Sequence, residues 1–240
     1  MNFSESAWQS AGPWFESILA HPFVLGLGDG SLAEGTFARY LVDDVHYLTG
    51  YARALAAIGS RAPDAEGIEL FAGAAVGAIA AETRTHAAFL TPRGIELGSS
   101  ELAEPSPTCC AYVGSLQATA AHDSVEVAIA AILPCFRVYA EVGRVLLTKR
   151  PGTDHPYRSW IDTYAAPEFD RVVRAVENYA DRLAAANTNG RREEMAAAYA
   201  FSTRFEWMFW DSAWRAQGWP EPTASRHRKV RKIPPGVYAG

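Results

Sequence analysis

A nearly all-apolar segment at residues 125–148 constrains the fold of this chain more than any other feature. Only four of its residues carry a charge, and the apolar run continues past Pro134. Its length and pattern predict one long helix, opened by a capping box in which Asp123 is followed by Glu126. A helix that is apolar on most faces must be covered by other helices, so we expect it at the centre of a bundle.

Two neighbouring residues interrupt this segment. Pro134 removes a backbone donor from the middle of the helix, at a cost of ~3 kcal/mol, and predicts a kink. Cys135 follows at once and shares a helical stripe with Tyr139, so both side chains should point inward. Arg137 and Glu141 fall on roughly the opposite side, toward solvent or another helix. From this helix alone, Cys135 is either a buried structural cysteine or a functional thiol beside an opening at the kink.

Composition favours a single globular protein. The 240 residues suit one large domain, and 49% of them are hydrophobic. Aromatic residues make up 12%, which is more than core packing needs and suggests an aromatic-lined pocket. Three cysteines without a CxxC pair make no disulfide framework, so a reducing, cytoplasmic setting is expected. The start of the chain does not look like a signal peptide, and the longest apolar run is too short to span a membrane.

Charge divides the chain into two parts. Residues 220–240 hold five Lys or Arg and one Glu, so their net charge is +4. Because the whole chain has a net charge of −5, residues 1–219 carry −9. An acidic body argues against nucleic acid as the main partner. We therefore expect one catalytic domain at residues 1–219 and a basic, proline-containing tail at residues 220–240. The tail is expected to be solvated, with docking on the acidic body or on a sister subunit as the alternative.

The rest of the chain also has helical patterns. Helices are expected at residues 4–19, 32–58, 65–89, 108–122, 157–164, 167–186 and 191–217. Residues 26–30 are expected to form a turn, before a second capping box at Ser31 and Glu34. No strand signal interrupts these segments, so the sequence predicts an all-α bundle of seven to eight helices.

Two of these helices carry carboxylates among aromatic rings. Tyr40, Asp44, Tyr47 and Tyr51 fall on one stripe. This stripe is either a helix–helix contact or a polar aromatic wall on which Asp44 fixes an amine or protonated ring of a ligand. Near the end of the last helix, Glu206 is surrounded by aromatic residues. It is either exposed beside buried rings or buried, in which case desolvation raises its pKa and makes it an acid near neutral pH.

Metal chemistry has weaker support. Glu82 and His86 are four residues apart and make half of a di-iron motif, but no second half is found, so a hydrogen-bonded pair at a helix interface is the simpler interpretation. The adjacent Cys109 and Cys110 could bind a soft metal, yet two ligands alone are weak evidence, and core packing is the simpler expectation.

Taken together and in order, several pieces of the chain resemble the cysteine-containing branch of the thiaminase II (TenA) family. The pieces are residues 21–23, 40–48, 105–108 with Tyr112, 133–143, 160–164 and 206–210. The resemblance runs from about Trp8 to Trp219. It implies a haem-oxygenase-like all-α fold.

The resemblance also implies an activity. It is hydrolysis at the 5-methylene carbon of a 4-aminopyrimidine, either thiamin or 4-amino-5-aminomethyl-2-methylpyrimidine, to give the 5-hydroxymethyl product in thiamin salvage or degradation. By similarity, Cys135 is the nucleophile, Glu206 the general acid and Asp44 the anchor for the pyrimidine. The remaining expected substrate contacts are Tyr47, Tyr112, Tyr139, Tyr164 and Phe209. No metal and no organic cofactor are implied, and the family analogy suggests a homotetramer.

Two other classes remain open at this point. A protein of the same fold could bind a pyrimidine without turning it over, as a regulatory protein would. A di-iron or haem oxygenase could use the same scaffold, but the missing ligands disfavour it.

Overall fold

The computed structural model describes residues 1–85, 89, 91, 104–149 and 152–220. Within them the chain forms nine α-helices and no strand. The helices are α1 (Phe3–Leu19), α2 (Pro22–Asp29), α3 (Glu34–Arg61), α4 (Ala65–Thr85), α5 (Pro107–His122), α6 (Val125–Thr148), α7 (Arg158–Tyr164), α8 (Pro167–Ala185) and α9 (Asn189–Trp214). The all-α prediction is confirmed, and the described part holds one helix more than the upper expectation.

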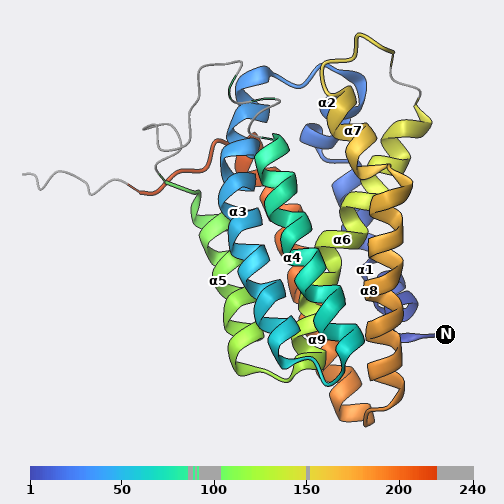
Figure 1. Cartoon of the computed structure of the whole chain (residues 1–240). Helices are drawn as coiled ribbons and strands as arrows, with labels where there is room; N and C mark the ends of the chain where they lie inside the picture. The colour runs from blue at the N-terminus through green and yellow to red at the C-terminus, as the bar shows by residue number, and fades with distance from the viewer. Residues whose placement is uncertain (86–88, 90, 92–103, 150–151, 221–240) are drawn as a thin grey trace, which may run out of the picture.

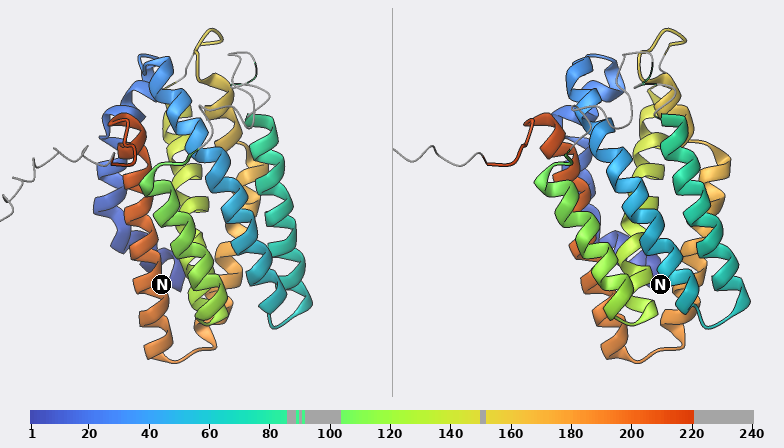
Figure 2. Two further views of the ribbon diagram at one scale, coloured as in Figure 1. Left: turned by 90° about the vertical axis from the view of Figure 1, so that its left-hand side faces the viewer. Right: turned by 60° about the vertical axis from the view of Figure 1, so that its left-hand side comes forward.

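The long helices run side by side along one axis, and the short α2 and α7 lie together at one end (Figure 1). Figure 2 shows α5 and α9 on a face that Figure 1 presents edge-on. Helix α6 packs against α3, α5, α7, α8 and α9, and most of its side chains are buried. The apolar segment is therefore central, as its composition predicts.

Helix α6 begins at the predicted residue, but its N-cap differs from the prediction by one residue. Ser124, not Asp123, is the N-cap, and its side chain accepts from the backbone N of Val127. Asp123 instead follows the end of α5 as its C-cap residue. Helix α6 continues through Pro134 to its expected end. The central place of α6 in the bundle thus follows from its apolar residues. Its N-cap is the one of two suitable residues that directly precedes the first helical residue.

The charged side of α6 turns toward α8. Arg137 pairs with Glu177 of α8 at 2.9 Å and with Glu141 at 3.1 Å, and its guanidinium lies 5.0 Å from the ring centroid of Trp8. The expectation that this stripe faces another helix is met. The opposite stripe, which carries Cys135, is thereby directed into the bundle.

The segment after α1 corrects a prediction. Residues 26–29, which were expected to lie in a turn, form the second half of α2. His21 caps this helix by accepting from the backbone N of Phe23. Gly30 ends this helix with φ of +82°, a conformation that glycine adopts without strain. The predicted capping box at Ser31 is also absent, because Ala33 is the N-cap of α3 and makes no side-chain bond. No helix among the described residues is long and apolar enough to cross a membrane.

Candidate active site

Five helices bring the eight predicted site residues into one part of the bundle. Helix α3 carries Asp44 and Tyr47, α5 carries Tyr112, α6 carries Cys135 and Tyr139, α7 carries Tyr164, and α9 carries Glu206 and Phe209. Six of them are buried, and Cys135 and Tyr164 are partly buried. Contacts and charge interactions link all eight, as the following geometry describes.

Glu206 is the best-defined acid of this region. It is only 1% exposed, and its Oε1 accepts a hydrogen bond of 2.5 Å from the hydroxyl of Tyr112. Burial raises the pKa of Glu206 to about 8, the charge of Asp44 acts in the same direction, and the bond from Tyr112 opposes both. Glu206 is therefore buried rather than exposed, and its carboxyl is largely protonated at neutral pH.

The thiol of Cys135 faces phenols and the same carboxyl group. Burial raises the pKa of Cys135 well above its ordinary value, and the charge of Glu206 raises it further. The phenols of Tyr47 and Tyr51, which border the sulfur, act in the opposite direction because they favour a thiolate. The resting site therefore holds a neutral thiol. The opposing charge is absent whenever Glu206 is protonated.

Cys135 is less buried than its neighbours on the inner side of α6. Cys135 keeps some solvent-accessible surface, although Ile132, Val138 and Tyr139, its neighbours one turn away on α6, are all buried. In addition, Oη of Tyr47 is buried and has no hydrogen-bond partner at ordinary distance among the described residues. Buried hydroxyls are normally bonded, so this one is available to a ligand.

Phenols also surround Asp44. It is 2% exposed, and its charge raises the pKa of Tyr40, Tyr139 and Tyr164 in addition to their burial. The hydroxyl of Tyr40 donates to Tyr139 at 3.3 Å and accepts from Nε1 of Trp160 at 3.4 Å. These phenols are neutral at physiological pH, so they act as hydrogen-bond donors and acceptors beside a carboxylate.

Two residues of this region were not predicted as site residues. Tyr51 donates to the backbone O of Ile132 at 2.8 Å and borders the thiol, and Tyr40 joins the network around Asp44. The sequence contained the signal, since both fall on the stripe of Asp44 and Tyr47. The stripe alone did not show which phenols would reach the site.

Aromatic rings close the region. Phe209 meets the rings of Tyr40 and Tyr47 edge-on, with centroids 5.8 and 5.4 Å apart. Trp210 stacks on Tyr40 at 5.1 Å with an interplanar angle of 8°, and Tyr139 packs against Tyr164 at 4.8 Å. Such a shell suits a flat, polar ring with a few directed hydrogen bonds.

The remaining candidates for metal binding gain no support. No group of three or more His, Cys, Asp or Glu side chains lies together in the described part of the chain. His86 and the side chain of Glu82 lie outside what the structure describes. Cys109 is buried and packs in the core, as expected, whereas Cys110 is exposed, so the core-packing prediction is wrong for that residue. Adjacent residues on a helix point about 100° apart, which separates the two thiols.

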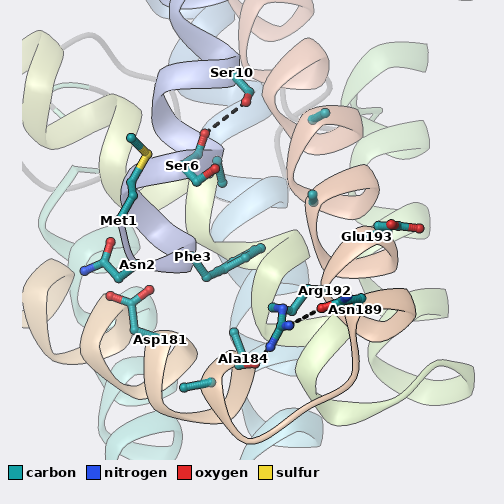
Figure 3. Close-up of a pocket in the computed structure, with 14 residues that line it drawn as sticks. Met1, Asn2, Phe3, Ser6, Ser10, Asp181, Ala184, Asn189, Arg192 and Glu193 are labelled. Atoms are coloured by element: carbon teal, nitrogen blue, oxygen red, sulfur yellow. Dashed lines mark hydrogen bonds between the residues drawn. The ribbon is translucent and has the colours of Figure 1, made fainter.

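Two surface pockets are distinct from this region. The larger, of about 510 Å³, lies between the starts of α1 and α9 and the end of α8, and is lined by polar side chains, alanines, Met1 and Phe3 (Figure 3). The other, of about 380 Å³, lies between α3, the start of α5 and the end of α9. None of the eight predicted site residues lines either pocket.

These features define a helical-bundle protein with a partly buried thiol and a buried, protonated carboxyl group in an aromatic setting. The chain belongs to the TENA/THI-4/PQQC family, whose sequence model matches residues 8–216.

Individual relatives agree with this assignment. The chain is 34% identical over 236 residues to an aminopyrimidine aminohydrolase of Bacillus subtilis (strain 168), a match that covers 95% of this chain and 99% of that protein. Its fold is similar to that of a TenA homologue from P. horikoshii OT3, with a TM-score of 0.81, 26% identity and coverage of 90% and 99% of the two chains. A Shewanella denitrificans domain with a heme oxygenase-like fold also matches, with a TM-score of 0.69, 15% identity and coverage of 90% and 93%. The expected haem-oxygenase-like fold is therefore confirmed.

Proposed function

We propose that this protein is an aminopyrimidine aminohydrolase of the thiaminase II type. It hydrolyses the bond at the 5-methylene carbon of a 4-aminopyrimidine and releases 4-amino-5-hydroxymethyl-2-methylpyrimidine. The observation that carries the proposal is a buried carboxyl group, Glu206, whose pKa lies near 8 and whose charge acts on the Cys135 thiol. The similarity to the Bacillus subtilis enzyme over almost the whole chain supports the same reaction class.

Glu206 acts first, as the general acid. A pyrimidine ring is a poor electrophile until one of its ring nitrogens is protonated. The carboxyl of Glu206 still holds its proton at neutral pH, and it can deliver that proton to the ring. The Tyr112 hydroxyl then stabilises the carboxylate that remains, because it already donates a hydrogen bond to Glu206 Oε1.

Cys135 adds to the activated ring as the nucleophile. Its sulfur forms a bond to ring carbon 6, the ring loses aromaticity, and the ring electrons expel the leaving group from the neighbouring methylene. Water adds to the methylene carbon, the C–S bond breaks, and the aromatic ring returns. For the aminomethyl substrate, one water is consumed and one ammonia is released.

The thiolate forms only when substrate is bound, as the thiol proton passes to the Glu206 carboxylate that ring protonation leaves behind. Burial opposes a thiolate in the resting site, but a protonated ring places a positive charge beside the sulfur. The Tyr47 hydroxyl, which borders the sulfur and has no hydrogen-bond partner among the described residues, is available to donate to the thiolate. Asp44 is proposed to hold the amidine-like edge of the pyrimidine by charge-assisted hydrogen bonds. Tyr139, Tyr164 and Phe209 complete the walls around the ring.

We favour the aminomethyl pyrimidine, a salvage substrate, over thiamin. The decisive experiment compares the rates at which purified protein converts each compound to the hydroxymethyl product, measured by mass spectrometry. Turnover of either compound supports the proposal. If neither is turned over while a pyrimidine still protects Cys135 from iodoacetamide, the protein is a pyrimidine-binding protein instead.

The family resemblance also motivates a proposal about assembly and extent. We propose a cytoplasmic homotetramer in which residues 1–219 form the catalytic domain and residues 220–240 are dispensable for turnover. Light scattering tests the tetramer. A chain ending at Trp219 should keep full activity, whereas one ending at Ala216 should lose part of it, because Gln217 and Trp219 bond to Thr108 and Pro105 beside α5.

A further inference from the structure

Helix α3 carries two consecutive aspartates that face different neighbours. Asp44 lies in the candidate active site, whereas Asp43 faces the start of α5. Asp43 is 5% exposed, and its carboxylate accepts two hydrogen bonds from Ser106, at 2.8 Å from the backbone N and at 2.6 Å from Oγ. Two short bonds from one residue to one carboxylate fix both the distance and the orientation of Ser106.

Ser106 is the N-cap of α5, so this contact holds the beginning of a helix. Its Oγ accepts from the backbone N of Cys109 at 3.1 Å while donating to Asp43. The thiol of Cys109 donates to the backbone O of Asp43 at 3.3 Å and closes the arrangement. We call these three residues, Asp43, Ser106 and Cys109, the Asp43 clasp.

Cys109 of the Asp43 clasp lies one helical turn before Tyr112, the residue that α5 contributes to the candidate active site. Tyr112 follows Cys109 by three residues, so the two lie on the same side of α5, about 5 Å apart along its axis. Tyr112 is the residue whose hydroxyl bonds to Glu206. A small tilt or slide of the start of α5 would therefore move this hydroxyl away from the Glu206 carboxyl.

We infer that Asp43 is a positioning residue, which holds α5 through Ser106 so that Tyr112 stays in hydrogen-bond contact with Glu206. This inference rests on the proposed function of Glu206 as the acid. Burial raises the pKa of Asp43, and the bonds from Ser106 lower it. A buried carboxylate is a costly way to join two helices, and the clasp gives this one a defined geometric role.

The chain contains a matched control for this contact. Elsewhere in the bundle, Asp181 of α8 accepts from the backbone N of Ser4 at 2.7 Å and from the Oγ of Ser4 at 2.9 Å. The chemistry is the same, and Ser4 also lies in the first turn of a helix, α1. Neither Asp181 nor Ser4 touches the candidate active site. A change at Asp181 therefore reports the general cost of losing such a contact.

The test compares Asp43→Ala and Ser106→Ala with Asp181→Ala, and uses Ser106→Thr as the conservative variant. The first readout is the titration of Glu206, followed by NMR in protein carrying ¹³C-labelled glutamate carboxyls and assigned by its loss in Glu206→Gln. The clasp and control variants change none of the titratable groups that surround this carboxyl on the facing helices, which are Asp44, Tyr47 and Tyr51 of α3, Tyr112 of α5, Cys135 and Tyr139 of α6, and Tyr164 of α7. Ser106→Ala alters no charge, so it separates positioning from a direct effect of the Asp43 charge.

We expect Glu206 to titrate at higher pH in Asp43→Ala and in Ser106→Ala, in the same direction as in Tyr112→Phe, which removes the bond directly. Adding Asp43→Ala to Tyr112→Phe should cause no further shift, because both act through one contact. At neutral pH, kcat should fall by about tenfold in either clasp variant, with a smaller change in KM. Ser106→Thr and Asp181→Ala should leave the titration unchanged, although the latter lowers Tm.

Two outcomes overturn the inference. One is a wild-type titration of Glu206 in folded Ser106→Ala or Asp43→Ala protein. The other is a shift of equal size in Asp181→Ala. Because the titration needs no substrate, it also separates the two proposals. A shift in the clasp variants, in a protein that hydrolyses no pyrimidine, supports the positioning role and refutes the proposed function.

Discussion

The hydroxyl of Tyr112 and the carboxyl of Glu206 are joined by a 2.5 Å hydrogen bond, although 94 positions separate them in the sequence. The bond links α5 to α9 in a place from which water is excluded. It favours the charged form of Glu206, while burial favours the neutral form more strongly. The protonation state of the Glu206 carboxyl near neutral pH is thus set by the packing around it, and small changes in that packing should change it.

The first prediction concerns the acid role of Glu206. Replacing it by Gln should lower kcat by about 10²–10⁴-fold, the usual contribution of a general acid. In the wild-type protein, kcat/KM should fall as the pH rises through about 8, because the carboxyl of the free enzyme then loses the proton it must donate. The residual activity of Glu206→Gln should not show this fall at alkaline pH. Unchanged turnover in this variant would remove Glu206 from the mechanism.

The second prediction concerns stability and follows from the same pKa. Glu206 titrates near 4.5 in an unfolded chain and near 8 when folded, so its contribution to stability is complete below pH 4.5 and is lost as the pH rises through about 8. Over that window the wild-type protein should lose roughly 3–5 kcal/mol relative to Glu206→Gln. Paired urea unfolding curves at pH 5, 7 and 9 measure this difference. Parallel curves for the two proteins would contradict it.

The third prediction concerns the nucleophile. Cys135→Ala should reduce turnover by at least about 10³-fold, because no other group can form the covalent intermediate. Cys110→Ser provides the control, since Cys110 is an exposed thiol on α5. It should leave kcat and KM unchanged. The covalent adduct itself should be visible by mass spectrometry of wild-type protein quenched during turnover.

The fourth prediction concerns the substrate anchor. Asp44→Asn removes a charge from the buried edge of the site and should raise KM by about 10–100-fold, the equivalent of one hydrogen bond to a charged group. Asp162→Asn is a suitable comparison, because Asp162 is an exposed carboxylate that pairs with Arg158. That variant should bind substrate normally. Equal KM values for the two variants would show that Asp44 does not contact the pyrimidine.

The fifth prediction concerns the close approach of α6 and α7. A Cβ at Gly143 would lie 2.7 Å from the carbonyl carbon of Tyr164, so Gly143→Ala must push α7 away. We expect a loss of about 1–3 kcal/mol in the free energy of unfolding and a displaced Tyr164 ring. Gly114→Ala places its methyl in open space on α5 and should instead stabilise the protein by about 0.5–1 kcal/mol. Thermal unfolding of both variants compares them directly.

The long helices could be predicted because each has a burial pattern of its own. Helix α6 begins and ends at the residues that its apolar run indicates. Helix α2 could not be predicted in this way, because eight residues that include Gly26 and Gly28 are too short and too flexible to show a period. It forms because Phe23 and Leu27 are buried against the rest of the bundle, which is information that lies elsewhere in the chain.

The site shows the same division. The stripe on α3 identified Asp44 and Tyr47 as neighbours, but a stripe from Tyr40 to Tyr51 extends over about 16 Å, longer than one small ligand. Which of its phenols border the thiol depends on where α6 and α9 cross α3. Likewise, an aromatic neighbourhood suggested a raised pKa for Glu206, but only the fold shows that Tyr112 reaches it from another helix.

The two consecutive aspartates of α3 occupy a single rigid turn, so they cannot move independently. Any axial rotation of α3 that advances Asp44 toward a bound ring withdraws Asp43 from Ser106 by a comparable arc. Ligand binding by Asp44 and the position of α5, which Asp43 holds through Ser106, are thus coupled through α3. Engineering this site for a bulkier heterocycle would therefore have to leave the position of α3 unchanged.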